Sequence, residues 1–393
     1  MFQEKRKIKA LLGEKTILII EPNANYRMTM KGFLRNLGIK NVTFAHSILE
    51  AKNILLCLDP GAIICEWNQP KTNGIQFCKE LKKQPRYFNI PFLLLSVENL
   101  KKDVTLASEV GIDGYLLKPF SQEEFEVSLY SALKTIVVPN PINNLLAKAE
   151  YYFQEGFFDK SQKLVETALK IKPNSARAMT ILSSLQIENG NKDEALRLLK
   201  QAIQENPSYL DAIKQILQIY LEDEKIEQVK EYALLGHEQS PENSKYILLL
   251  ARCYLDEGLV EDSEKMFKKA IRYAPKMAEA YKGLGKLYLI QDEYDLAMKN
   301  LNKALDLDDS DISTLNSLGL AYVKAGRYEE GLDKYQAALK IKPNDHRILF
   351  NLGFANEKLN DIEKARYYYQ QAVHHNPDFE KAFKRLQGLK LAS

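Results

Sequence analysis

The feature that most constrains the fold of this chain is a proline that recurs at a constant interval in its second half. The members of this series are Pro173, Pro207, Pro241, Pro275, Pro343 and Pro377. The step from Pro275 to Pro343 is twice as long as the others, and Asp309 lies at its midpoint. Each proline is expected to end a helical unit, because proline cannot continue a helix. A fixed period of this length indicates stacked repeats in which each unit packs against its neighbours.

Small residues follow the same period. At one fixed position ahead of each proline and of Asp309 the chain carries Ala149, Ser183, Leu217, Ala251, Gly285, Gly319 and Gly353, and all of these except Leu217 are small. Small side chains on one face let two helices approach closely. Large apolar residues such as Tyr281, Leu284 and Tyr288 fill the space beside them at helical spacing. The second half is therefore predicted to consist of helix pairs.

This pattern resembles the tetratricopeptide repeat, a helix–turn–helix unit of about 34 residues. The resemblance covers seven units over residues 142–379, and residues 380–393 are expected to form a capping helix. It implies an all-α solenoid that holds a peptide or a partner protein in a concave groove lined by the first helix of each unit. The groove positions, in register, are Lys214, Gln218, Arg252, Lys282, Lys286, Asn316, Phe350 and Phe354.

The middle of this groove is basic. Lys282 and Lys286 lie four residues apart on one helix face, with Arg252 and Asn316 expected nearby. Such a group is suited to an acidic segment or a C-terminal carboxylate. A solvated basic face without a ligand is the alternative, and the sequence leaves both open. The complete carboxylate-clamp pattern of the resembled family is absent.

The first part of the chain, residues 15–136, alternates apolar runs with helical segments. The apolar runs span residues 17–20, 42–45, 62–65, 92–95 and 115–117. Strands that alternate with helices predict a parallel sheet covered on both faces. We therefore expect a five-stranded, doubly wound α/β domain.

Polar residues stand where four of these runs end. Glu21 follows the first run, Glu66 the third, Ser96 the fourth and Lys118 the fifth. The carboxyl ends of parallel strands form one edge of the sheet, which is where ligands bind in open α/β folds. Two carboxylates, a hydroxyl and an ammonium are therefore predicted to converge.

These residues resemble a bacterial response-regulator receiver domain of the chemotaxis-regulator type. The motifs that carry the resemblance are Ile17–Glu21, Glu66–Pro70, Asn73–Gly74, Ser96 and Gly114–Phe120. The resemblance places the acidic pair of that family on Glu21 and Pro22 and the phosphorylated aspartate on Glu66. It also places the switch hydroxyl on Ser96, the aromatic switch residue on Tyr115 and the invariant lysine on Lys118.

Two of these positions depart from the family. Receivers phosphorylate an aspartate with the help of Mg²⁺, which prefers octahedral oxygen coordination and carboxylate ligands. Pro22 offers no side-chain oxygen, and Glu66 is one methylene longer than aspartate. Because a misplacement of about 1 Å can cost on the order of 100-fold in rate, we expect a pseudo-receiver that is not phosphorylated and needs no cofactor.

Two interpretations of this edge stay open. In the first, Glu66 reaches Lys118 and imitates the charge of an aspartyl-phosphate. In the second, the edge has lost its function and the domain only docks a second protein. The alternative function is a working phosphorelay regulator that uses Mg²⁺ and whose phosphorylation controls the repeat groove.

Composition narrows the remaining possibilities. The 55 basic and 52 acidic residues are too balanced for a dedicated nucleic-acid binder, and no apolar run approaches the length of a membrane span. The four cysteines form no C-x-x-C pair, which favours a reducing cytoplasm. Residues 1–14 are a basic leader and residues 137–141 a proline-stiffened linker. With no catalytic constellation visible, we expect a cytoplasmic bacterial signalling adaptor and not an enzyme.

Overall fold

The computed structural model describes residues 2–69, 72–97, 112–137 and 141–391. The parts of the predicted segments that lie outside these residues are residue 1 of the leader, residues 70–71 (with Pro70 of the receiver motif) and 98–111 of the α/β domain, residues 138–140 of the linker and residues 392–393 of the capping segment. The chain divides into two compact units, residues 1–218 and 219–393, and each is described by itself.

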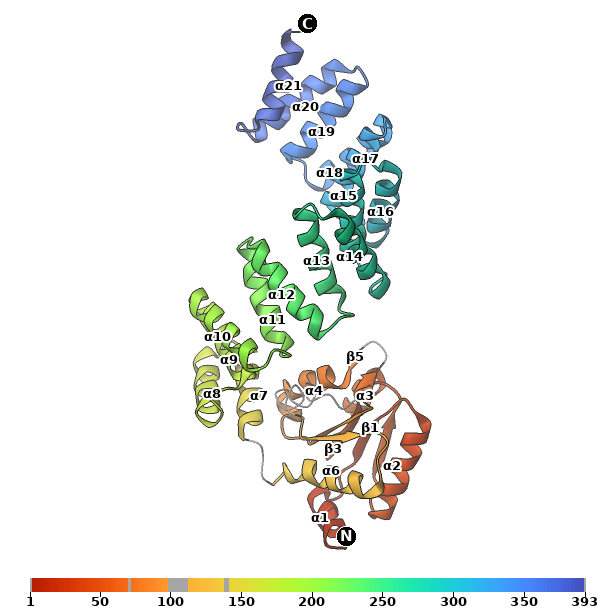
Figure 1. Ribbon diagram of the computed structural model, residues 1–393, viewed down its shortest axis with the longest axis vertical. Coiled ribbons are helices and arrows are strands. Elements are labelled where there is room, and N and C mark those ends of the chain that lie inside the picture. Colours follow the sequence, from red (N-terminus) through yellow and green to blue (C-terminus); the bar gives the residue numbers. More distant parts are fainter. Residues whose placement is uncertain (1, 70–71, 98–111, 138–140, 392–393) are drawn as a thin grey trace. The chain divides into compact units, whose positions relative to one another are not determined.

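The first unit contains the predicted five-stranded parallel sheet (Figure 1). Its strands are β1 (Ile17–Ile20), β2 (Val42–Ala45), β3 (Ala62–Glu66), β6 (Phe92–Ser96) and β7 (Gly114–Leu117). They lie in the order β2-β1-β3-β6-β7, and every neighbouring pair is parallel. The prediction of a doubly wound α/β domain is confirmed.

Helices cover both faces of the sheet because successive strand residues point to opposite sides. The helices are α1 (Phe2–Leu12), α2 (Ala24–Asn36), α3 (Ile48–Leu55), α4 (Gly74–Lys82) and α6 (Gln122–Lys134). Ile17 and Ile19 of β1 pack in a core with residues of α1, α2 and α6. Leu18 and Ile20 pack in the opposite core with residues of α3 and α4. All four residues of β1 are fully buried, as a central strand between two helical layers requires.

The segment interpreted as a basic leader forms helix α1. Its Ile8 and Leu12 are buried in the same core as Leu129 and Leu133 of α6. Lys7 lies 6.0 Å from the centroid of the Tyr130 ring, also on α6. Helix α1 therefore extends the core of the α/β domain towards the amino terminus.

Short elements complete this domain. The two-residue strands β4 (Asn68–Gln69) and β5 (Thr72–Asn73) pair antiparallel just after β3, and a 3₁₀ turn, η1, spans Pro85–Tyr87. At the start of α6, Ser121 and Glu124 form a capping box, in which each side chain accepts from the backbone N–H of the other residue.

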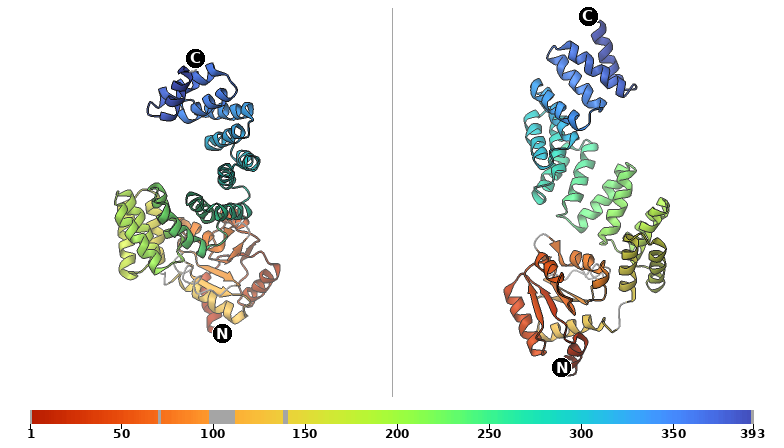
Figure 2. Two further views of the ribbon diagram at one scale, coloured as in Figure 1. Left: turned by 45° about the horizontal axis from the view of Figure 1, so that its top comes forward. Right: turned by 180° about the vertical axis from the view of Figure 1, so that it is seen from behind.

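Helix pairs follow for the rest of the chain (Figure 2). The first helices are α7 (Pro141–Gln154), α9 (Ala176–Glu188), α11 (Leu210–Glu222), α13 (Ser244–Asp256), α15 (Ala278–Ile290), α17 (Ile312–Lys324) and α19 (His346–Lys358). The second helices are α8 (Phe158–Ile171), α10 (Lys192–Glu205), α12 (Ile226–Gln239), α14 (Val260–Tyr273), α16 (Tyr294–Leu307), α18 (Tyr328–Ile341) and α20 (Ile362–His375). From α9 onward, the first helices start at one constant interval, which is the interval of the prolines.

The turn inside each pair has the same geometry. Its left-handed residue is glycine at four places and a larger residue at three others, Glu224, Asp292 and Asn360, with φ of 55°, 59° and 62°. The full series is Gly156, Gly190, Glu224, Gly258, Asp292, Gly326 and Asn360. A left-handed residue just after a helix lets the chain reverse and satisfies the last carbonyls of that helix.

The small-residue columns lie where the two helices of a pair cross. The Ser161 hydroxyl donates to the Ala149 carbonyl at 2.8 Å, and Ser263 donates to the Ala251 carbonyl at 2.7 Å, so the helices touch at their backbones. In later pairs glycine leaves room for a ring: a Cβ built on Gly319 would lie 2.6 Å from Cε1 of Tyr335, which is fully buried.

The last helix, α21 (Glu380–Leu391), packs beside α20. Its Ala382 is fully buried against Leu349 and Ala372, whereas Phe383 is 47% exposed. Among the described residues, no helix is both long and apolar enough to cross a membrane.

Replacing Gly319 with alanine tests the close contact between this residue and the Tyr335 ring. Because the new methyl group must displace the Tyr335 ring, we expect a loss of about 1–3 kcal/mol in stability. Thermal unfolding followed by circular dichroism should show a lower midpoint. Gly388→Ala is the matched control: it is also helical, no atom lies within 4 Å of its Cβ position, and alanine should leave stability equal or slightly higher. Equal midpoints for Gly319→Ala and the native protein would contradict the packing argument.

Candidate functional site

The carboxyl edge of the sheet brings the predicted polar residues together. Glu21 follows β1, Glu66 is the last residue of β3, Ser96 the last of β6, and Lys118 follows β7. Local structure fixes Glu66: the Gly74 N–H donates to the Trp67 carbonyl at 2.8 Å, and a Cβ on Gly74 would lie 2.8 Å from the Glu66 carbonyl oxygen. The Asn73–Gly74 motif therefore allows α4 to start close beneath this edge.

The Lys118 ammonium lies between the two carboxylates. It donates to Glu21 Oε2 at 2.6 Å and also to Glu66 Oε2. All three side chains are buried, with 4% of Lys118, 2% of Glu21 and 7% of Glu66 exposed. The ammonium also lies 4.2 Å from the centroid of the Tyr26 ring.

The remaining carboxylate oxygens have donors as well. Glu21 Oε1 accepts from the Asn23 backbone N–H at 2.9 Å, and Glu66 Oε1 accepts from the Asn68 backbone N–H at 3.2 Å. Each carboxylate therefore has one oxygen on the lysine and one on the backbone.

The protonation equilibria reflect this enclosure. Burial raises the pKa of Glu66, although Lys118 and the Asn68 N–H act in the opposite direction. Burial acts to lower the pKa of Lys118, but its bonds to Glu21 and Glu66 outweigh burial and the net shift is upward. The lysine is therefore firmly charged, and the site holds one ammonium between two carboxyl groups.

The donor set does not fit a Mg²⁺ ion in this arrangement. Pro22 is exposed, and its only oxygen, the backbone carbonyl, accepts from Arg27 at 2.7 Å. Glu21 and Glu66 are both bonded to Lys118. Mg²⁺ needs near-octahedral oxygen coordination that includes free carboxylates. Within the described residues, no group of three or more His, Cys, Asp or Glu side chains is placed to hold a metal.

The two predicted switch residues lie on neighbouring strands, Ser96 on β6 and Tyr115 on β7. Ser96 is 2% exposed, and its carbonyl accepts from the Lys118 N–H at 2.7 Å. Tyr115, on β7, is half-buried and packs against the core that contains Leu94 and Ile75. Ser96 therefore lies beside the Lys118 backbone, whereas Tyr115 belongs to the core on one face of the sheet.

Comparison with known proteins identifies the two parts of the chain. Residues 17–130 match the family described as response regulator receiver domain. Residues 152–218, 244–277, 285–360 and 346–379 match families described as tetratricopeptide or TPR repeat. The chain is a receiver domain joined to tetratricopeptide repeats. The resemblances drawn from the sequence are confirmed at this level.

Individual proteins resemble each part of the chain. The receiver is 28% identical over 120 residues to a chemotaxis protein CheY homolog of Campylobacter jejuni, covering 30% of this chain and 92% of that protein. Among solved structures, the repeats are similar to MamA, with 23% identity and a TM-score of 0.38 over 44% of this chain and 94% of that one. They are also similar to YrrB, a TPR protein with an unusual peptide-binding site. The identity is 18% and the TM-score 0.40, and the match covers 48% of this chain and 97% of that one.

The basic groove positions of the second unit are partly neutralised. Lys282, on α15, donates to Asp311 Oδ2 at 2.9 Å, and Asp311 also caps α17. Lys286, one turn further along α15, donates to the Ser313 hydroxyl at 3.1 Å. Burial lowers the pKa of Lys286, and the charges of Lys282 and Arg252 act in the same direction. Lys286 and the exposed Arg252 are therefore the positions where positive charge is available.

The other predicted groove positions take part in packing. Asn316 accepts from Asn351 at 2.8 Å. Phe350 contacts the Tyr369 and Phe379 rings at centroid distances of 5.5 and 5.4 Å. Phe354 lies between Lys358 and Arg385, 5.5 and 5.3 Å from its centroid.

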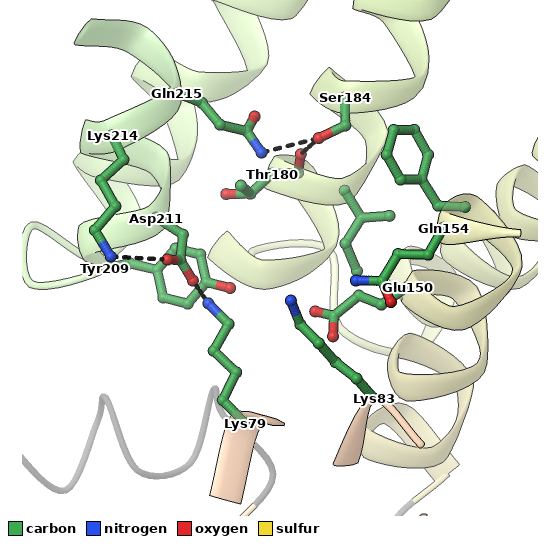
Figure 3. A pocket seen from close by; sticks show the side chains of 12 residues that line it. Lys79, Lys83, Glu150, Gln154, Thr180, Ser184, Tyr209, Asp211, Lys214 and Gln215 are labelled. Atoms are coloured by element: carbon green, nitrogen blue, oxygen red, sulfur yellow. Dashed lines mark hydrogen bonds and ion pairs between the residues drawn. The ribbon is translucent and has the colours of Figure 1, made fainter. Parts of the chain in front are cut away.

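In the first unit, Gln218 is exposed on α11, and Lys214 lies on the same helix, 3.5 Å from Asp211 Oδ1. Lys214 lines a cavity whose other residues sequence reasoning did not find, among them Lys79 and Lys83 of the receiver and Glu150 of α7 (Figure 3). These residues are far apart in the sequence, and no sequence pattern indicates that they line one cavity.

Replacing Lys118 with methionine tests the cluster. It leaves two buried carboxyl groups, and losing one partner of a buried ion pair costs about 3–5 kcal/mol. A carboxyl whose pKa is higher in the folded than in the unfolded state stabilises most when protonated. The free energy of unfolding of Lys118→Met should therefore be low at pH 7 and rise as the pH falls towards 5. Urea unfolding followed by the fluorescence of Trp67, the single tryptophan, measures the receiver alone.

Lys52→Met is the matched control. Lys52 pairs with Glu80 at 2.7 Å, but the two side chains are 49% and 44% exposed. An exposed pair contributes about 0–1 kcal/mol, so this variant should stay near the native protein at each pH. A Lys118→Met variant that behaved like Lys52→Met would show that the cluster does not stabilise the fold.

Proposed function

We propose that this protein is a cytoplasmic signalling adaptor of bacteria that acts by binding other proteins and has no catalytic activity. The receiver, residues 15–136, orients one partner, and the repeats, residues 142–379, bind another. The observation that carries the proposal is the contact of Lys118 with both Glu21 and Glu66 at the edge where receivers act.

The receiver is proposed to be a pseudo-receiver. Three features support this: Pro22 in place of an acid, the longer Glu66 in place of aspartate, and the engagement of both carboxylates by Lys118. The Glu66–Lys118 contact places a carboxyl group against the lysine without any phosphorylation. It favours imitation of an aspartyl-phosphate over simple decay of the site.

A phosphoryl-transfer assay tests this directly. The intact protein is incubated with Mg²⁺ and acetyl phosphate, and its mass is recorded at neutral pH. We expect an unchanged mass, because Glu66 is bonded to Lys118 and the donor set does not fit the metal. A receiver known to accept the phosphoryl group, treated in parallel, shows that the reagent is active.

The second candidate function is a phosphorelay regulator whose phosphorylation controls the repeat groove. The match of residues 17–130 to the receiver family favours it. An added phosphoryl group on the native receiver, lost in Glu66→Gln, would establish this candidate and overturn the pseudo-receiver. The double variant Pro22→Asp/Glu66→Asp tests whether restoring the family's acids restores acceptance.

The repeats are proposed to bind an acidic segment of a partner protein in the second unit. Arg252, Lys282 and Lys286 carry three positive charges there, and Asp311 cancels one of them. The surplus lies at Lys286 and Arg252, which can offer charge-assisted hydrogen bonds to a carboxylate. Phe350 and Phe354, on α19 of the same unit, are half-buried and supply apolar contact area.

Charge reversal at these two residues tests the groove. The full chain carrying Arg252→Glu/Lys286→Glu should lose, by tenfold or more, a partner that the native protein captures, and capture by the native protein should weaken as salt is raised. Lys282 is left intact because its loss would also remove the bond to the cap of α17.

The matched control reverses two exposed lysines on second helices, Lys265→Glu/Lys303→Glu. Their side chains are 71% and 51% exposed and pair with acids of their own helix turn. This variant changes the net charge equally and should retain the partner. Equal capture by all three proteins would remove the support for the groove.

A further inference from the structure

The receiver meets the first repeats along helix α4 within the first unit. Lys79 of α4 forms an ion pair with Asp211 of α11 and lies 5.7 Å from the centroid of the Tyr209 ring. Phe88, which follows η1, contacts the Tyr151 ring of α7 edge-on at 6.2 Å. Side chains far apart in the sequence therefore enclose common space.

This space is a cavity of about 340 Å³. Its polar residues are Lys79, Lys83, Glu150, Gln154, Thr180, Ser184, Tyr209, Asp211, Lys214 and Gln215. Figure 3 shows the Lys79 and Lys83 side chains extending from the receiver towards Asp211 and Glu150, with Lys214 approaching Asp211 from α11. The volume lies at the lower end of the range for small-molecule sites, about 300–1,000 Å³.

Both acids of the cavity are already occupied. Glu150 accepts from Arg177 Nε at 2.9 Å and from Arg177 Nη2 at 3.1 Å, and the arginine side chain is 2% exposed. Asp211 uses Oδ2 for Lys79 and Oδ1 for Lys214. Burial lowers the pKa of Lys79 to about 7, the charge of Glu150 acts in the opposite direction, and the basic groups of Arg177, Lys214 and Lys83 lower it further. Neither carboxylate has an oxygen left without a cationic partner.

The cavity therefore has more basic than acidic side chains. The four basic side chains of Lys79, Lys83, Lys214 and Arg177 face only two carboxylates, those of Glu150 and Asp211, so basic side chains outnumber acidic ones by two. Lys83 is half-buried, and no hydrogen bond or ion pair joins its ammonium to a described residue. Charges in a partly enclosed space are screened less than on an open surface, so this excess attracts an anion.

We propose that this cavity binds a small phosphoryl dianion, either free phosphate or the phosphoryl group of a small metabolite. Its negative charge favours the protonated form of these lysines, and its several acceptor oxygens suit the amino groups of Lys79, Lys83 and Lys214. Thr180, Ser184 and Gln215 supply further polar groups around them. Because Lys83 belongs to the receiver and Lys214 to the repeats, the ligand bridges the two and stabilises their contact.

The test is isothermal titration of the full chain with inorganic phosphate and, separately, with a phosphomonoester such as ribose 5-phosphate. We expect saturable one-to-one binding, and the tighter of the two identifies the source of the phosphoryl group. Lys83→Gln and Lys214→Gln should each weaken binding about tenfold, because each removes one charge-assisted contact. The ligand should also raise the unfolding midpoint reported by Trp67 fluorescence in the native protein.

Lys31→Gln and Lys200→Gln are the controls. Both lysines are exposed, one on α2 of the receiver and one on α10 of the repeats, away from the cavity lining. They should bind the ligand like the native protein. Binding that is absent, or that is unchanged in Lys83→Gln and Lys214→Gln, would overturn the proposal, and succinate binding as tight as phosphate would overturn the phosphoryl assignment. None of these results bears on the phosphoryl-transfer or groove experiments.

Discussion

One buried ammonium between two carboxylates holds the receiver edge together. Glu21 and Glu66 stand at the ends of neighbouring strands, β1 and β3, so the parallel sheet forces two acids into one largely dry space. Lys118 reaches them from β7, beyond β6, and supplies the only charge among these three that can offset both. Buried charges without partners are costly, and the pairing is therefore a condition for this edge to fold as it does.

The repeats follow a different constraint, which is the distance of closest approach between helices. Ser161 and Ser263 bond to the backbone of the partner helix, and Gly319 accepts the edge of the Tyr335 ring. The left-handed turn residue recurs at the same period, and larger side chains are tolerated there at Glu224, Asp292 and Asn360. Backbone geometry is thus preserved at positions where side-chain identity varies.

Charge acts locally in this protein, since a net charge of +3 over the chain says little about either site. In the second unit Asp311 removes Lys282 from the available positive charge and leaves Lys286 and Arg252. In the first unit Glu150 is taken up by Arg177, which leaves Lys83 unmatched in a cavity. In each unit, the basic side chains that stay available are those that no nearby carboxylate pairs with.

The sequence by itself determined the two folds, the strand ends and the spacing of the repeats. These depend on local periodicity, on proline and on the alternation of strand residues, all of which are written in order along the chain. Only the tertiary structure decided that Ile8 and Leu12 join the receiver core, that Asp311 pairs with Lys282, and that Lys83 faces Glu150 across a cavity. The physical reason is that ion pairs and cavities depend on distances between residues that are far apart in the sequence. Local sequence patterns do not specify these distances.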